Sequence, residues 1–292
     1  MENYINNELL LTAIEGIVYI SSAFIILFIG KKVYDVLHKD IDVKSELVSK
    51  DNFAFAVSHA GYLLGLLLSI GGAIVGPSNG LYIDLIDIFV YGFLGVILLN
   101  LSLIINDKII LKEFSTRKEI VEDQNVGTGV VEAASSVAAG LIIYGAITGE
   151  ATSLSQGLLT AVVFWALAQF ILLITSYVYN LITPYNIHQE IEKDNVAVGL
   201  GFSGAIIAIA NLIRFGIEGE FVGWANVLSE VGFDVFLGLA LLPIMRMLTD
   251  KILLPGAKLT DEIVNQKKPN IGAGLIEAFA YIGGSILLTW CI

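Results

Sequence analysis

Long apolar runs dominate this chain and limit its possible folds more than any other feature. Each is about 20 residues long, the length of helix that crosses a hydrocarbon core about 30 Å thick. Spans of a membrane β-barrel would be about 10 residues of alternating polarity. The sequence therefore predicts an all-α integral membrane protein with eight transmembrane helices. These runs cover roughly 9–30, 53–75, 82–106, 126–148, 155–182, 196–216, 223–248 and 271–292.

The composition agrees with a membrane location and excludes several kinds of site. Only 15% of the residues are charged, against about 25% in soluble domains. A single cysteine, Cys291, and three histidines exclude a disulfide framework and make haem, zinc or iron–sulfur sites improbable. The net charge of −12 is spread through loops and helices. We expect no cofactor, no metal site and no nucleic-acid surface.

A short motif containing asparagine repeats along the chain. The tetrads "DNFA", "QNVG", "DNVA" and "PNIG" each open an even-numbered apolar run, at intervals of 73, 70 and 75 residues. Each Asn suits a helix N-cap, where its side chain accepts a hydrogen bond from a backbone N–H. The motif predicts four two-helix repeats, residues 1–75, 76–148, 149–216 and 217–292, that together form one membrane domain. The four N-cap residues are Asn52, Asn125, Asn195 and Asn270.

Small residues follow each Asn at the same offsets. Gly, Ala or Ser recurs four and eight positions after it, as in Gly129/Ala133 and Gly274/Ala278. Residues four apart share a helix face, and small faces allow close helix packing in lipid. We therefore expect the even-numbered helices to form the tightly packed interior. Two spans per repeat make the four copies parallel, so pseudo-fourfold symmetry or a pair of pseudo-dimers is expected.

The distribution of Lys and Arg predicts the orientation in the membrane. The linkers within the repeats, 31–51, 107–124, 180–194 and 246–269, hold 15 of the 16 basic residues. Because positive loops stay inside, the longer linkers should be cytoplasmic, and the N-terminus and C-terminus should lie outside. These linkers are too short to form a soluble catalytic domain.

The sequence resembles a known bacterial family at the starts of the repeats. "SKDNFAFAVSHAGYLLG" and "EKDNVAVGLGFSGAI", together with the two-span unit, are similar to the inner-membrane family called domain of unknown function 350. The resemblance covers all four repeats. It implies a multi-pass protein of the bacterial inner (plasma) membrane, and it implies no established activity.

Ionisable residues lie within several of the predicted spans. Seven positions after each Asn come His59, Glu132, Phe202 and Glu277, so three repeats out of four carry an ionisable group at one level of the even-numbered helices. The odd-numbered helices add further acids, which we expect at two levels. Asp84, Asp87 and Glu230 lie near the outer entrance, and Glu15 and Asp234 lie near the midplane.

These acids lack an evident counter-ion. An ionised carboxylate at the centre of a span costs about 2.5–3.5 kcal/mol, and the linker boundaries leave no Lys or Arg at that depth. The acids are then either protonated or line a wet path that binds a cation. As the structural alternative, a protonated Glu132 would donate a hydrogen bond to Ser58, Ser135 or a backbone carbonyl and hold helices together.

Three functions follow from these patterns. The first is a cation-conducting or proton-coupled transport protein, whose path near the pseudo-axis passes small cations or protons by Glu132, Glu277, His59, Asp234, Glu230 and Glu15. The second is a scaffold or accessory subunit that does not transport and docks a cytoplasmic partner through its linkers. An enzyme is the third and least favoured, because no catalytic motif is found. Besides the lipid bilayer, a homo-oligomer is compatible with each function.

Overall fold

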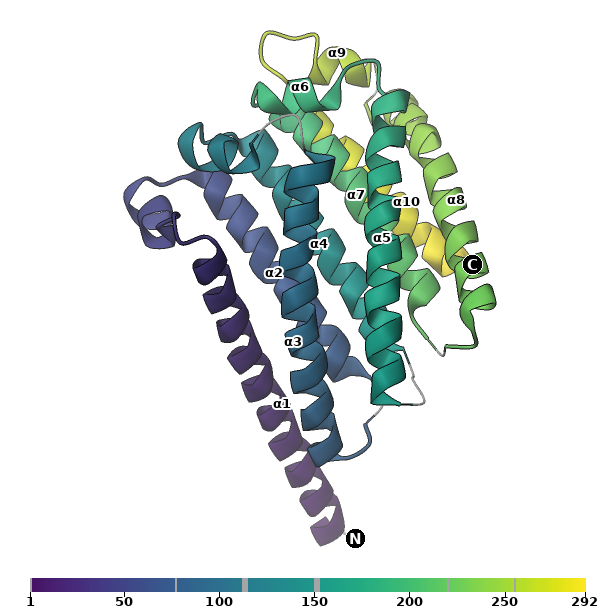
Figure 1. The fold of residues 1–292 in the computed structure, drawn as a ribbon. Helices are drawn as coiled ribbons and strands as arrows, with labels where there is room; N and C mark the ends of the chain where they lie inside the picture. Colours follow the sequence, from purple (N-terminus) through teal and green to yellow (C-terminus); the bar gives the residue numbers. More distant parts are fainter. Residues whose placement is uncertain (1, 77, 112–114, 150–152, 220, 255) are drawn as a thin grey trace.

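Eight long helices form the protein in a computed structural model that describes residues 2–76, 78–111, 115–149, 153–219, 221–254 and 256–292 (Figure 1). Within these residues, eight helices are long and apolar enough to cross a membrane. The predicted all-helical membrane fold is confirmed. The long helices are α1 (Glu2–Leu37), α2 (Phe53–Val75), α3 (Leu81–Ile105), α4 (Val126–Thr148), α5 (Leu154–Ile182), α7 (Val196–Ile217), α8 (Trp224–Leu248) and α10 (Ile271–Cys291).

Short helical segments connect the long helices at one end of the bundle, which we call the linker side. The opposite end is the terminal side. The α-helical connectors are α6 (Ile187–Glu192) and α9 (Leu259–Ile263), and the π-helical ones are η1 (Ser45–Ser49), η2 (Asn106–Ile110), η3 (Lys118–Glu122) and η4 (Thr249–Leu253). Because η2 and η4 continue α3 and α8, the corresponding apolar spans run to Ile110 and Leu253.

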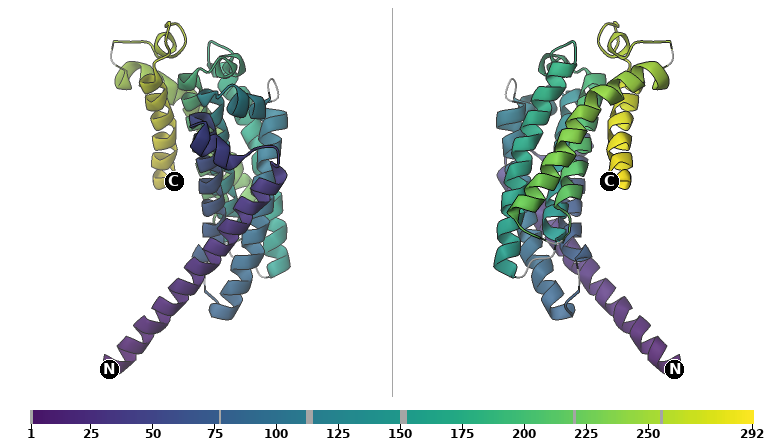
Figure 2. Two further views of the ribbon diagram at one scale, coloured as in Figure 1. Left: turned by 90° about the vertical axis from the view of Figure 1, so that its left-hand side faces the viewer. Right: turned by 90° about the vertical axis from the view of Figure 1, so that its right-hand side faces the viewer.

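The helices that follow the four Asn residues pack in a row. Extensive contacts join α2 to α4, α4 to α7 and α7 to α10, and α2 and α10 stand at the two ends of the row. Figure 1 shows α3, α5 and α8 in front of this row, while α1 crosses its end at an angle (Figure 2). The expectation of four helices around a pseudo-fourfold axis is therefore wrong. The two central helices, α4 and α7, each present small residues to both neighbours in the row, which favours a row over a ring.

The small residues at the start of each inner helix make the row possible. A Cβ atom added to Gly199 would lie 2.7 Å from the carbonyl oxygen of Gly127 on the preceding helix, well inside van der Waals contact. Gly129 stands in the same relation to Ala54, and Gly274 to Ala197. The residue four positions after one Asn thus packs on the residue two positions after the previous Asn. This repeat explains the small-residue pattern in the sequence.

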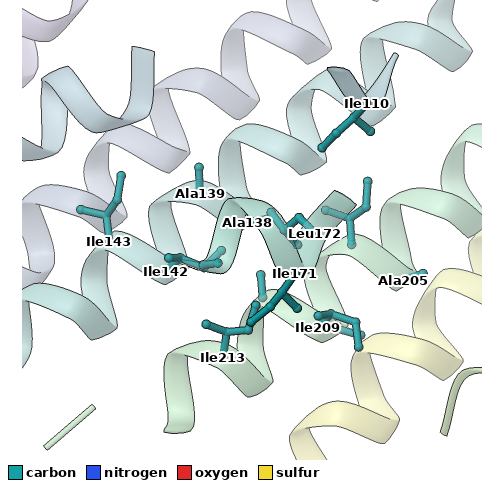
Figure 3. Packing of buried hydrophobic residues seen from close by; sticks show 14 of the residues in the cluster. Ile110, Ala138, Ala139, Ile142, Ile143, Ile171, Leu172, Ala205, Ile209 and Ile213 are labelled. Atoms are coloured by element: carbon teal, nitrogen blue, oxygen red, sulfur yellow. The ribbon is translucent and has the colours of Figure 1, made fainter. Parts of the chain in front are cut away.

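Further from the linker side, larger apolar side chains fill the space between the layers. Figure 3 shows Ile142 of α4, Ile171 of α5 and Ile209 of α7 meeting in one cluster. Ile142 and Ile209 are completely buried. Lipid offers no hydrophobic drive between helices, so close packing of this kind must hold the layers together.

The repeated Asn does more than cap its own helix. The Oδ1 atom of Asn125 accepts from the backbone N–H of Thr128, while Nδ2 donates to Glu119 Oε2 (2.8 Å) and to the carbonyl oxygen of Ile191 (2.8 Å) in the next repeat. Asn52 and Asn195 make the same three bonds. Asn270, in the fourth repeat, makes only the first two with the residues that the structure describes. Their partners are Phe55, Glu46 and Ile120 for Asn52; Val198, Glu190 and Ile263 for Asn195; and Ala273 and Glu262 for Asn270.

This Asn clamp fixes the local backbone and the charge of its carboxylate. The preceding residue is left-handed in three repeats, with φ of 48° at Asp51, 53° at Gln124 and 59° at Asp194, a region in which Asp is favoured over most residues. In the first clamp, burial raises the pKa of Glu46, but hydrogen bonds from Lys50 and Asn52 outweigh it and leave that pKa below its usual value of 4.5.

Candidate functional site

Two cavities open into the first four helices, one from each side. The terminal-side cavity has a volume of about 520 Å³ and lies among α1 to α5. Asp84 and Asp87 of α3 both line it, as the sequence predicted for an outer entrance, together with Tyr19 and Tyr91.

Hydrogen bonds distinguish the two aspartates of the terminal-side cavity. Asp84 accepts from the hydroxyls of Tyr19 and Ser78, both at 2.6 Å, and from the backbone N–H of Asn79 at 2.8 Å. It therefore ties the loop before α3 to α1. Asp87, one turn deeper, has no hydrogen-bond partner among the residues that the structure describes. Of the two, Asp87 is free to bind a ligand.

The linker-side cavity has a volume of about 270 Å³ and is lined in part by Thr116, Arg117 and Ile120 of the linker between α3 and α4. Two carboxylates, Glu132 of α4 and Asp107 of η2, line it. Ser58 of α2 lines the same cavity as Glu132, and it is one of the partners that the structural alternative names for this glutamate. The rest of the wall is largely apolar, and its other polar residues are Tyr34, His38, Asn100, Thr116 and Arg117.

Two buried oxygen atoms in this wall have no hydrogen-bond partner among the described residues. Asn100 is 5% exposed, and its Nδ2 donates to Val96 O (2.7 Å) and Tyr62 Oη (3.2 Å), which fixes the amide and leaves Oδ1 without a hydrogen bond. Thr116 is 3% exposed, and its Oγ1 is likewise unpartnered. Buried polar atoms are nearly always satisfied by protein, water or ligand. The linker-side cavity therefore provides oxygen acceptors for a donor that enters it.

An apolar barrier separates the two cavities. Asn100 lies nine positions after Tyr91 on α3, which corresponds to about 14 Å along the helix axis. Between these levels Leu66, Ile26 and Leu99 are completely buried. Leu66 packs directly on Gly30 of α1. The cavities thus face opposite sides of the bundle without being joined.

His59 lies behind the wall of the linker-side cavity. It is 5% exposed, and its ring packs against Tyr34 (centroids 4.9 Å apart) and Phe55 (5.5 Å). Its Nδ1 atom has no hydrogen-bond partner among the described residues. Tyr34 lies between His59 and the cavity that contains Glu132. His59 and Glu132, which were predicted to lie at one level, therefore both lie near the wall of the linker-side cavity.

Glu277 occupies a different environment, because it has a counter-ion. Arg246 of α8 forms an ion pair with it through Nη1 and Oε1. Arg246 is 8% exposed and Glu277 is fully buried. The Oε1 atom also accepts from the hydroxyls of Tyr281 (2.9 Å) and Tyr179 (3.3 Å). The expectation that no basic residue lies at this depth is wrong for Glu277.

The error came from the predicted start of the last linker. Arg246 had been assigned to the linker 246–269, but α8 continues to Leu248 and η4 extends the span to Leu253. One signal in the sequence could have placed it, since Met247 and Leu248 continue the apolar run beyond the arginine. The ring of Tyr185 faces its guanidinium, with Cζ 5.6 Å from the centroid. Burial raises the pKa of the Tyr185 phenol, which stays neutral.

The remaining predicted acids line neither cavity. Asp234 is 6% exposed and faces Gly216 at the contact between α8 and α7. Glu230, one turn nearer the terminal side, is exposed. Glu15 precedes Tyr19, the partner of Asp84, by one turn and therefore lies near the terminal end of α1 instead of the midplane. The predicted descent of carboxylates through one path is not what the structure shows.

The arrangement defines a multi-pass membrane protein built from tandem two-helix units. It belongs to the family described as Domain of Unknown Function (DUF350), whose model matches residues 7–147 and again 153–292. Each match covers two of the hairpins. We call the helices of the first match, α1 to α4, the first half, and α5, α7, α8 and α10 the second half.

Two curated transmembrane proteins are similar to this chain. The chain is 22% identical over 272 residues to a UPF0719 transmembrane protein of Aquifex aeolicus, an alignment that covers 92% of this chain and 97% of the relative. It is 28% identical over 125 residues to the UPF0719 transmembrane protein YshE of Bacillus subtilis, covering 43% of this chain and 87% of that protein. No solved structure matches the chain significantly. This second match thus covers less than half of the chain but most of a shorter protein.

Proposed function

We propose that this protein transports a cation across the bacterial inner membrane, and that the path lies within its first half. The observation that carries the proposal is the pair of cavities, which open on opposite sides of the same four helices and each contain two carboxylates. From the excess of Lys and Arg in the linkers, we place the linker side in the cytoplasm and both termini outside. We propose no catalytic role.

The charges of the two cavities favour a positive ligand. Among the described residues, none of Asp84, Asp87, Asp107 and Glu132 forms an ion pair with Lys or Arg. Arg117 also lines the linker-side cavity, but its charge is paired with Asp40 at 2.6 Å. Carboxylates that face a cavity without counter-ions attract cations.

The barrier between the cavities favours alternating access over an open pore. The intervening side chains are apolar and fully buried, and about 14 Å of helix separates the two cavities. A transporter exposes its site to one side at a time, which requires such a barrier to shift. α1 meets the inner row through close contacts, such as that of Leu66 on Gly30. We propose that α1 moves relative to α2 and α3 at this barrier.

Flux through purified protein in liposomes tests the proposal. With an imposed gradient of K⁺, Na⁺ or H⁺, the wild type should pass at least one cation, and Glu132→Gln should lower that rate about tenfold, equivalent to about 1.4 kcal/mol. Glu230→Gln is the matched control, because this exposed acid lies outside both cavities, and its rate should equal that of the wild type.

Two outcomes would contradict transport through the first half. Equal flux in Glu132→Gln and wild type would remove Glu132 from the path. No flux from the wild type for any tested cation would instead favour the scaffold, in which the linkers dock a partner protein. Reversal of linker charges would then abolish co-purification of that partner.

A further inference from the structure

The second half contains a charged group where the first half has a cavity. Glu132 and Glu277 correspond, because each lies seven positions after its Asn. The segments "NDKII" (106–110) and "TDKIL" (249–253) correspond as well, and both are π-helical extensions of an outer helix. By this correspondence Arg246, three positions before the second segment, matches Leu103 in the first half.

Aromatic contacts support the same correspondence. Tyr34 packs on His59 with ring centroids 4.9 Å apart, and Tyr179 packs on Phe202 at 5.4 Å. His59 and Phe202 are the residues seven positions after their Asn residues. In each half, a tyrosine of the outer helix therefore meets this level of an inner helix beside the glutamate. The main difference is the arginine, whose equivalent Leu103 lines the linker-side cavity.

We propose that the linker-side cavity binds a small guanidinium cation, in the place where the second half holds the guanidinium of Arg246. This inference names the substrate class of the site described above and rests on the proposed function. Glu132 would be the principal anionic partner, as Glu277 is for Arg246. The bound ligand would supply the positive charge that Arg246 supplies in the second half and that Leu103 cannot supply in the first.

The size and the polar atoms of the cavity fit such a ligand. Its volume of about 270 Å³ equals that of about nine water molecules at about 30 Å³ each, which exceeds the space needed by a bare metal ion. A guanidinium presents several N–H donors in one plane. Glu132 and Asp107 can accept from it, and so can the unpartnered Oδ1 of Asn100 and Oγ1 of Thr116.

The apolar part of the wall favours guanidinium over a strongly hydrated cation. Phe55, Leu103 and Ile104 line the cavity and offer nothing to replace a hydration shell. Guanidinium is more weakly hydrated than ammonium and stacks on aromatic rings. Tyr34 provides such a ring in this wall, as Tyr185 does for Arg246 in the second half.

Calorimetric titration of the purified protein in detergent with methylguanidinium tests the inference. The wild type should show saturable binding, and Glu132→Gln should weaken it at least about tenfold. Leu103→Arg should abolish binding because it places a guanidinium in the cavity. Glu230→Gln is the matched control for the loss of a carboxylate, because this exposed acid lies outside both cavities, and it should bind like the wild type.

The outcomes separate this inference from the proposed function. Absence of saturable binding to the wild type would overturn the guanidinium assignment, and so would unchanged binding in Glu132→Gln. If the wild type nevertheless passes K⁺, Na⁺ or H⁺ in liposomes and Glu132→Gln does not, only the ligand class is wrong. Should Leu103→Arg fail to fold, the comparison of Glu132→Gln with the wild type still decides the question.

Discussion

Replacement of Glu277 by Gln should destabilise the second half without affecting the cavities. The carboxylate is fully buried and accepts from Arg246 Nη1, Tyr281 Oη and Tyr179 Oη. A glutamine oxygen can still accept one or two of these bonds, but the charge is lost. Arg246 would then have no anionic partner among the described residues, and its other contacts are Thr260 Oγ1, at 3.3 Å, and the ring of Tyr185.

The magnitude follows from the charge that remains buried. A hydrogen bond between membrane helices contributes about 0.6 kcal/mol on average, whereas removal of one partner of a buried ion pair costs about 3–5 kcal/mol. The second effect decides, because Arg246 cannot deprotonate. At about 2–4 °C per kcal/mol for a chain of this size, the melting temperature of Glu277→Gln should fall by about 6–20 °C.

The double variant Arg246→Leu/Glu277→Gln provides the control. Both charges are removed, and position 246 then carries a leucine, as the equivalent position 103 does in the first half. Because a buried ion pair can be replaced by uncharged side chains at little cost, we expect most of the lost stability to return. Thermal unfolding followed by circular dichroism in one detergent measures all variants.

Two results would refute this reasoning. A fall of less than about 2 °C in Glu277→Gln would mean that the guanidinium is not buried as the structure shows. A double variant as unstable as the sum of the single variants would mean that the two side chains are not coupled. Cation flux is expected to survive in Glu277→Gln protein that remains folded, because Glu277 lines neither cavity.

The Asn clamps lead to two further predictions. Asn195→Ala removes a cap and the bond to the next repeat, so thermal unfolding should show a loss of about 1–2 kcal/mol. The loss should be larger than for Asn270→Ala, because Asn270 makes no bond to a carbonyl of another repeat among the described residues. Equal losses would contradict the clamp. The lowered pKa of Glu46 contributes stability that is present above pH 4.5 and lost as the pH falls through the folded-state pKa. Glu46→Gln should therefore reduce the change in stability between pH 6 and pH 3, as measured by thermal unfolding. An unchanged pH dependence would contradict this prediction.

Part of this fold was readable from local patterns. Apolar length alone gave eight spans, since a membrane core has one thickness and a helix has one rise per residue. The recurrence of Asn52, Asn125, Asn195 and Asn270 indicated repeated helix starts, because an N-cap depends only on the first turn of its own helix. The small residues indicated close packing, because residues four apart share one face of their own helix.

The sequence could not say which groups meet. Whether the inner helices form a row or a ring depends on the angles at which whole helices cross. The same uncertainty misplaced Glu15, whose level follows from the tilt of α1 against α3 (Figure 2). Linker-side contacts such as that of Asn125 with Ile191 also join residues more than 60 positions apart, beyond the reach of a local pattern.

By itself, the sequence determined that carboxylates lie within the membrane-spanning helices and that Glu132 and Glu277 are equivalent positions. Only the tertiary structure decided that one of them meets Arg246 while the other faces a cavity. The physical reason is that a buried charge is governed by the nearest few ångströms of its surroundings. Those surroundings belong to neighbouring helices, and the way these helices pack together is not determined by the sequence of any single helix.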